Sequence, residues 1–157
     1  LSYTDVYHLT EQHVFHEAGM TWIRKPRIKT GNVCHIPLLP EAAAIIERYR
    51  GIHTRAFRHE PSKGYLLPIP GCDTVNIHLK KIARLCGIQK TLTYHMARHT
   101  FASQMTLSEG VSIESVSKML GHSQIKTTQV YAETSPERVF LDIEKILPQL
   151  AHYQLTN

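Results

Sequence analysis

The chain has 157 residues, of which 42% are apolar and 20% charged, and this composition predicts one globular domain rather than a disordered or fibrous chain. Its apolar runs are short and no basic and apolar leader opens it, so we expect no membrane span, no export and a place in the cytoplasm. The formal net charge of +5 favours a polyanionic partner, because Lys and Arg release counterions from phosphates.

The cysteines and histidines form no metal-binding motif in the sequence. The three cysteines lie far apart, which matches neither a disulfide framework nor Cys-x-x-Cys spacing. The eleven histidines include no His-Glu-x-x-His pair. We therefore expect free thiols, no metal site and no cofactor.

The N-terminal part of the chain predicts a short helix followed by a small sheet. Helical spacing covers residues 3–9, and three extended runs follow at 13–16, 21–24 and 33–38. The connectors 17–19 (EAG) and 30–32 (TGN) contain the Gly or Asn that tight turns need. The runs should pair as an antiparallel sheet with one buried face formed by Cys34, Ile36 and Leu38.

The middle of the chain predicts two helices separated by a loop. Pro40 opens the first helix at its tolerated position, and helical spacing continues to about residue 50. The stretch 51–71 is rich in Pro and Gly and predicts a loop with one short strand at 65–67. Asp73 is expected to cap the next helix, which ends at Gly87. The buried face of that helix should consist of Val75, Leu79, Ile82 and Cys86.

The last part of the chain predicts four more helices. The first begins at residue 93 or 94 and carries His95, Arg98, Phe101 and Met105. The second is capped by Ser112 and stopped by Gly121, and a short third helix carries Val130 and Tyr131. Ser135-Pro136 opens the fourth, which runs with an apolar stripe to about residue 150.

These elements predict an α+β fold that is mainly α-helical, with a small three-stranded antiparallel sheet packed on a helical core. We expect a single domain over residues 1–157. The chain begins without Met inside the first expected helix, so we expect a fragment of a longer protein.

Four residues in the last part of the chain could act together on a phosphate. His95 and Arg98 lie three positions apart, so both emerge on one helix face, where the Arg fork can bind two phosphate oxygens. His122 follows the helix-ending Gly121, and Tyr131 comes nine positions later. Each feature alone is ordinary: a solvated basic face, a helix end and a core aromatic. Their conjunction predicts a Tyr hydroxyl held among cationic donors.

This conjunction resembles the tyrosine recombinases, also called the phage integrase family. Residues 94–102 (YHMARHTFA) are similar to that family's helix with His-x-x-Arg-His-x-Phe-Ala, in which His99 is a supporting position. The separation of His122 and Tyr131 is also the usual one for the family. The resemblance covers nearly the whole chain and implies the fold of that family's catalytic domain.

The resemblance implies site-specific recombination or integration at double-stranded DNA attachment sites, without metal or ATP. Tyr131 would attack the scissile phosphate, form a 3′-phosphotyrosine bond and release a 5′-hydroxyl, and a 5′-hydroxyl from another strand would reverse the step. Arg98 would stabilise the transition state, while His95 and His122 donate hydrogen bonds and manage the Tyr proton.

The resemblance also assigns residues between the second and third predicted strands. Lys29 lies in this turn, where the family's lysine protonates the leaving 5′-oxygen, and its position favours it over Lys25. We expect contacts to the DNA backbone from Arg24, Lys25, Arg27 and Thr30.

The chain departs from the family pattern at its first residues. The family has Gly-Leu-Arg-x-x-Glu, whereas residues 1–5 (LSYTD) place Ser2 where the Arg stands and Asp5 where the acid stands. A Ser hydroxyl supplies no charge. Either Arg24 or Arg27 fills the role, or the domain is a catalytically impaired DNA-binding module. Because some integrases of conjugative and other mobile elements also lack this Arg, we favour the first explanation.

Further expectations concern assembly. The family usually has a preceding domain that clamps DNA, and we expect no such domain within residues 1–157. The C-terminal helix could dock on a neighbour in a homotetramer on DNA, with a monomer in the absence of DNA, or it could fold back on its own core. A type IB topoisomerase is an alternative enzyme with similar chemistry. The sequence does not name the target site, the host element or the direction of reaction.

Overall fold

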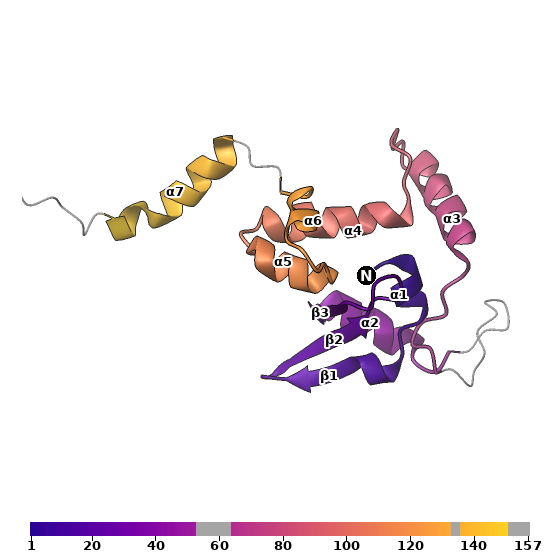
Figure 1. The fold of residues 1–157 in the computed structure, drawn as a ribbon. Coiled ribbons are helices and arrows are strands. Elements are labelled where there is room, and N and C mark those ends of the chain that lie inside the picture. The colour runs from indigo at the N-terminus through magenta and orange to yellow at the C-terminus, as the bar shows by residue number, and fades with distance from the viewer. Residues whose placement is uncertain (53–63, 133–135, 151–157) are drawn as a thin grey trace, which may run out of the picture.

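The computed structural model describes residues 1–52, 64–132 and 136–150, and in these ranges a small sheet lies beside a group of helices (Figure 1). The first part contains α1 (Tyr3–Tyr7), a 3-10 turn (Glu11–His13), β1 (Val14–Glu17), β2 (Met20–Pro26), β3 (Val33–Pro37) and α2 (Pro40–Tyr49). The second part contains α3 (Cys72–Leu85), α4 (Tyr94–Ala102) with a π-helical continuation (Ser103–Leu107), α5 (Ile113–Leu120), α6 (Lys126–Gln129) and α7 (Pro136–Leu150). The predicted mainly helical α+β class is confirmed.

The sheet has the predicted antiparallel topology, with β2 between β1 and β3. Ile23 in the middle strand pairs with Val14 on one side and Ile36 on the other. Side chains alternate along β2, so Ile23 and Lys25 are buried while Arg24 between them is exposed. This alternation decides which basic residues of the sheet can reach a partner.

Two clusters of apolar side chains form the core. One lies under the sheet and consists of Leu9, Ile23, Ile46 and Leu66, with Ile36 and Leu38 packed against it. The other joins the helices and consists of Ala102, Val116 and Leu120, with Tyr131 packed against it. β3 contacts α5 between the two clusters, and Cys34 of β3 is fully buried there. Of the expected buried face of β3, Cys34 is the completely enclosed member.

One expectation about α3 is wrong, and another holds only in part. Asp73 does not cap the helix, because α3 begins at Cys72 with Gly71 at the N-cap, and Asp73 lies in the first turn. Of the expected buried face, Val75 and Leu79 are half-buried, whereas Ile82 is 50% exposed and Cys86 is also exposed; the fully buried residue is Ala83. The helix is rotated because α4 contacts it: the backbone N–H of Tyr94 donates to Asn76 Oδ1 at 2.9 Å, which turns the Asn76 side of α3 inward.

Two expectations about the last helices are also wrong. After α4 the chain continues as a π-helix, whose wider turn buries Thr106 and leaves Met105 56% exposed instead of inward. The short helix α6 ends at Gln129, so Val130 is its C-cap and Tyr131 lies just beyond it. Tyr131 therefore stands on a turn and not within a helix.

The loop and the last helix follow the expectations in part. The short strand expected at 65–67 is reduced to one bridge between Tyr65 and Thr10. Residues 53–63 of the loop and the expected cap Ser135 lie outside the described residues. α7 begins at Pro136, and its apolar side chains from Val139 to Leu147 are between 40% and 65% exposed, because the helix extends away from the others (Figure 1). No helix in the described ranges is long and apolar enough to cross a membrane.

Candidate active site

Arg98 lies at the centre of the candidate site, buried on α4. Its Nη2 donates to the backbone oxygen of Leu120 at 2.7 Å and lies 3.1 Å from Nε2 of His122. Its Nη1 is buried and has no hydrogen-bond partner. One nitrogen of the fork is thus anchored to the end of α5, and the other remains available to an anion.

His122 is placed by the end of α5. Gly121 adopts the left-handed conformation (φ 64°, ψ 42°) that stops the helix, and the N–H of His122 then donates to the Ser117 oxygen at 3.0 Å. The ring nitrogens contact two residues, with Nδ1 lying 2.9 Å from the Thr128 hydroxyl oxygen. Burial, followed by the positive charges of Arg98 and Arg27, lowers the pKa of His122 to about 4. The ring is therefore neutral near pH 7.

Tyr131 lies half-buried beside two histidines. Its ring centroid is 4.8 Å from that of His99 in an edge-to-face arrangement and 6.3 Å from that of His122, with the planes 14° apart. Its backbone N–H donates to the Thr128 oxygen at 3.0 Å. His95 is exposed on α4, one turn before Arg98. The structure thus brings Tyr131, His99, His122 and Arg98 together, and it leaves the ring of His95 open to solvent.

Ser2 and Asp5 form a cap and not a phosphate site. The Ser2 hydroxyl accepts from the Asp5 N–H, and Asp5 Oδ2 accepts from the Ser2 N–H at 3.4 Å, which together form a capping box at the start of α1. The Ser2 hydroxyl also donates to Asp5 Oδ2 at 2.5 Å. Asp5 is buried, and its Oδ1 accepts from the N–H of Ile28 at 2.9 Å. Burial raises the pKa of Asp5, but the hydrogen bonds from Ser2 and Ile28 and the charge of Arg27 outweigh it, so the net pKa is lowered. Asp5 therefore anchors the connection between β2 and β3 as a carboxylate.

Arg27 lies in that connection and reaches the same helix end as Arg98. Its side chain is 16% exposed, and its Nη1 donates to the Gly121 oxygen at 3.4 Å. Its Nε is 4.0 Å from Asp5 Oδ2, is buried and has no hydrogen-bond partner. In the described part of the chain, the buried side-chain nitrogens without a partner are this Nε and Nη1 of Arg98. Two guanidinium groups thus converge on the end of α5 with donors unused.

The other basic residues of β2 and of the connection to β3 do not reach the end of α5. Lys29 and Thr30 are exposed on the tight turn that begins at Arg27, where Gly31 N–H donates to the Arg27 oxygen at 2.8 Å. Arg24 lies over the Phe15 ring at 4.5 Å and 4.0 Å from Glu17, on the β1 side of the sheet. Lys25 is only 7% exposed, with its Nζ 3.2 Å from His13 Nε2. Lys25 is therefore enclosed in the structure, and its expected contact with the DNA backbone stays a prediction.

Sequence reasoning gives Gly121 only as a helix stop and does not single out Thr128, although both residues shape the site. Gly121 supplies the oxygen that holds Arg27, and Thr128 touches His122 through its side chain and Tyr131 through its backbone. Thr128 is completely buried, which is unusual for a polar residue in a short helix. Its position three residues before Tyr131 is the signal that the sequence offers.

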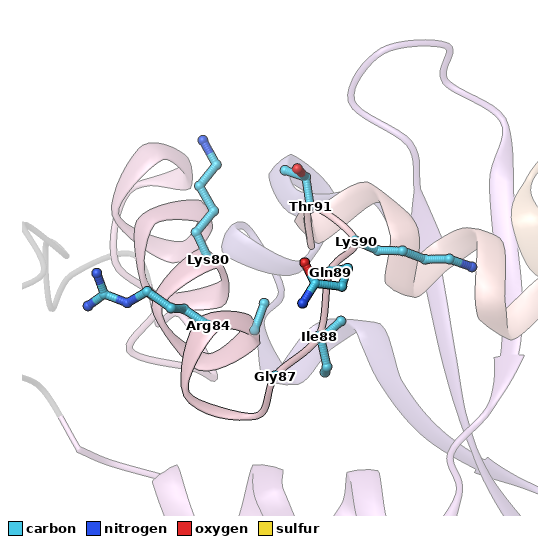
Figure 2. A pocket seen from close by; sticks show the side chains of 8 residues that line it. Lys80, Arg84, Gly87, Ile88, Gln89, Lys90 and Thr91 are labelled. Atoms are coloured by element: carbon cyan, nitrogen blue, oxygen red, sulfur yellow. The ribbon is translucent and has the colours of Figure 1, made fainter.

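One hollow borders this cluster and another lies apart from it. One, of about 740 Å³, is bordered by His99, Tyr131 and Asp142 together with the π-helical segment and residues 108–112. The other, of about 460 Å³, lies at the end of α3, and its lining includes Lys80, Arg84 and Lys90, whose charged ends point in different directions (Figure 2). None of the residues predicted for the site lines the second hollow. Within the described ranges, no group of His, Cys, Asp or Glu side chains is arranged as metal ligands would be.

Comparison with known proteins identifies the family. A family model described as the phage integrase family matches residues 3–138. This chain belongs to the phage integrase family. The resemblance carried by His95, Arg98, His122 and Tyr131 is therefore confirmed at the level of the family.

Members of this family with known sequences and structures resemble the chain over much of its length. The tyrosine recombinase XerD of Lacticaseibacillus casei is 30% identical over 119 residues, which cover 73% of this chain and 40% of the relative. The structure of XerH site-specific recombinase bound to its difH substrate has a TM-score of 0.66 at 16% identity, covering 89% of this chain and 41% of that chain. The Tn1549 transposon integrase in complex with circular intermediate DNA has a TM-score of 0.63 at 19% identity, covering 92% and 54%.

The structural matches and the sequence match support different conclusions. The two solved structures share the fold with this chain. The match to the XerD relative spans 40% of the length of that recombinase, so it concerns one part of that protein.

Proposed function

We propose that this chain is the catalytic domain of a site-specific DNA recombinase or integrase that cleaves and rejoins DNA through Tyr131. The observation that carries the proposal is the convergence of Arg98, His122 and Arg27 on the end of α5, with Tyr131 packed beside His122. The named relatives are tyrosine recombinases and a transposon integrase, which supports DNA and a mobile element as the context. The protein would work in the cytoplasm.

In the proposed reaction the Tyr131 hydroxyl oxygen attacks the scissile phosphorus as its proton leaves to a neighbouring base. A 3′-phosphotyrosine bond forms, the bond to the 5′-oxygen breaks, and that oxygen takes a proton from Lys29 to leave as a hydroxyl. A free Tyr hydroxyl has a pKa near ~10, so proton acceptance and phosphate binding must assist the attack. His95 and His122 would form hydrogen bonds to the phosphate and help to move the Tyr131 proton. A 5′-hydroxyl of another strand reverses the sequence, which needs neither metal nor ATP.

Position 2 holds Ser where the family pattern has a phosphate-binding Arg, and we propose that Arg27 takes over the role of that Arg. Arg27 has a buried Nε without a hydrogen-bond partner and shares the end of α5 with Arg98. Arg24 is the poorer candidate because its guanidinium lies over Phe15 and near Glu17. Ser2 caps α1, and its hydroxyl donates to the Asp5 carboxylate. Asp5 in turn accepts from the N–H of Ile28, which lies in the segment that carries Arg27 and Lys29. In this proposal, Arg27, between β2 and β3, supplies the positive charge that Ser2 cannot give to the phosphate.

A DNA substrate that traps the covalent intermediate tests the proposal. With a nicked suicide substrate or a 5′-bridging phosphorothiolate, we expect a covalent protein–DNA adduct that forms in excess EDTA and disappears in Tyr131→Phe. Arg27→Ala should cleave roughly 100-fold more slowly, by analogy with the loss of one oxyanion donor. Arg24→Ala is the matched control: even if it weakens DNA binding, it should cleave at the parent rate once the DNA is fully bound.

The outcomes separate the parts of the proposal. A parent protein that binds DNA without forming any adduct would be a DNA-binding module and not an enzyme. Adduct formation with Arg27→Ala and Arg24→Ala both as fast as the parent would contradict the replacement of the missing arginine. Relaxation of supercoiled DNA without joining of attachment sites would indicate a topoisomerase activity instead of recombination.

A further inference from the structure

His122 is in a defined protonation state because of what its two ring nitrogens face. Nε2 lies 3.1 Å from Nη2 of Arg98, and a guanidinium can donate a hydrogen bond but cannot accept one. Nε2 must therefore be the accepting nitrogen of a neutral ring. The ring proton is then on Nδ1, which lies 2.9 Å from Oγ1 of Thr128 and donates to it.

Thr128 is placed to hold this arrangement. Its side chain is completely buried, so its hydroxyl is shielded from water that would compete for the Nδ1 proton. Its backbone oxygen accepts the N–H of Tyr131 at 3.0 Å, while its own N–H donates to the Ile125 oxygen at 2.7 Å. One residue of α6 therefore contacts the imidazole of His122 and the backbone of Tyr131 at the same time.

We propose that Thr128 is a positioning residue that keeps His122 in the Nδ1-protonated tautomer and couples it to Tyr131. In this tautomer Nε2 presents a lone pair beside Arg98, so His122 is a hydrogen-bond acceptor in the DNA-free protein. The opposite tautomer would turn an N–H toward the guanidinium, so that two donors would face each other, and the Thr128 hydroxyl would have to donate to Nδ1 instead of accepting from it. The catalytic part of this proposal depends on the proposed function, in which Tyr131 is the nucleophile.

A simpler possibility is that Thr128 only fills space in the core. The two roles differ in what the hydroxyl does, because Val has nearly the same shape as Thr but cannot accept a hydrogen bond, whereas Ser keeps the hydroxyl and loses a methyl group. Thr127 is exposed on the same helix and offers a matched control for the change from Thr to Val. The comparison of these variants separates the hydrogen bond from packing.

Nitrogen NMR of ¹⁵N-histidine-labelled protein gives the direct test, since it distinguishes a protonated ring nitrogen from an unprotonated one. In the parent protein at neutral pH we expect His122 with Nδ1 protonated and Nε2 bare. Thr128→Val should produce a mixture of tautomers and slow the cleavage of a suicide substrate about tenfold, the size expected for a lost hydrogen bond. Thr128→Ser and Thr127→Val should keep the parent tautomer and cleave within about twofold of the parent.

Three results would overturn the proposal. The first is a parent protein whose His122 carries its proton on Nε2 or on both nitrogens. The second is a folded Thr128→Val protein with the parent tautomer and the parent rate. The third is a changed His122 tautomer in Thr128→Ser. If Thr128→Val does not fold, the spectra of the parent and of Thr128→Ser test the proposal. The Nδ1 tautomer in a parent protein that cleaves no DNA would contradict the proposed function and the catalytic part of the inference, while the contact itself would stand.

Discussion

Gly121 is the residue on which the two arginines depend. Its left-handed backbone turns the chain so that its own oxygen accepts from Arg27 while the oxygen of Leu120 accepts from Arg98. A Cβ atom at this position would lie 2.7 Å from Cys34 Sγ and 2.8 Å from Cδ of Arg27. The absence of a side chain is therefore required twice, once for the backbone angle and once for the close approach of the sheet.

Gly121→Ala is expected to destabilise the protein and to displace Arg27. The left-handed angle alone costs roughly 1–2 kcal/mol for a residue with a Cβ, and the overpacking against Cys34 and Arg27 adds about 1–3 kcal/mol. Chemical denaturation would measure the free energy of unfolding. Gly19→Ala is the matched control, because Gly19 has a similar φ of 74° and a Cβ there would meet nothing within 4 Å. Equal losses for the two variants would show that the close approach of Arg27 is not important.

α7 is the element with the most exposed apolar surface. Phe140 is 65% exposed and Ile143 47%, and these side chains lie on a helix that extends away from the rest of the described chain (Figure 1). The hollow of about 740 Å³ beside Tyr131 offers a recess close to the nucleophile. We propose that α7 docks on a neighbouring copy when several copies assemble on DNA, which corresponds to the expected homotetramer.

Phe140→Ser and Ile143→Ser together should prevent this assembly without unfolding the chain. Exposed side chains contribute little to the stability of the monomer, so the free energy of unfolding should change by less than about 0.5 kcal/mol. Native gels with DNA that carries paired attachment sites would show the loss of the higher complexes, while binding of one chain to one site remains. Glu144→Ser, an exposed polar position on the same helix, is the control. A large loss of monomer stability would instead indicate packing of α7 on its own chain.

At the scale of the whole molecule, two groups of exposed basic side chains among the described residues could meet DNA. One is the turn that carries Lys29, and the other is the hollow at the end of α3 with Lys80, Arg84 and Lys90 (Figure 2). With a net charge of +5, these 157 residues by themselves should bind DNA weakly and with a strong dependence on salt. The basic hollow would then act as a second point of contact with the backbone.

Lys80→Gln and Arg84→Gln should each weaken DNA binding by a similar factor for every DNA sequence. Each should also reduce the slope of log K against log salt by about 1, because each removes one phosphate contact. Fluorescence anisotropy with labelled duplexes over a series of salt concentrations would measure both effects. Lys145→Gln is the control, since Lys145 is near Asp142 on α7, with Nζ to Oδ1 at 3.8 Å. If the slope of log K against log salt is unchanged in the α3 variants, these two side chains do not contact DNA phosphates.

Several features of the fold could be predicted because they depend on neighbours in the sequence. Turn residues and alternation predicted the three strands, and Ser112 and Gly121 predicted both ends of α5. The same alternation could have shown that Lys25 shares the buried face of Ile23, since side chains two apart in a strand point the same way. The rotation of α3 could not be predicted, because it follows from the contact of Asn76 with the start of α4.

The sequence by itself determined the class of fold, the ends of most elements and the order of His95, Arg98, His122 and Tyr131 that marks the family, because these are properties of spacing along one chain. Only the tertiary structure decided that Arg27 and not Arg24 reaches the same helix end as Arg98, and that the Thr128 hydroxyl oxygen lies 2.9 Å from Nδ1 of His122. Both contacts join segments far apart or on different elements, and a hydrogen bond of about 3 Å requires those elements to be placed in space first.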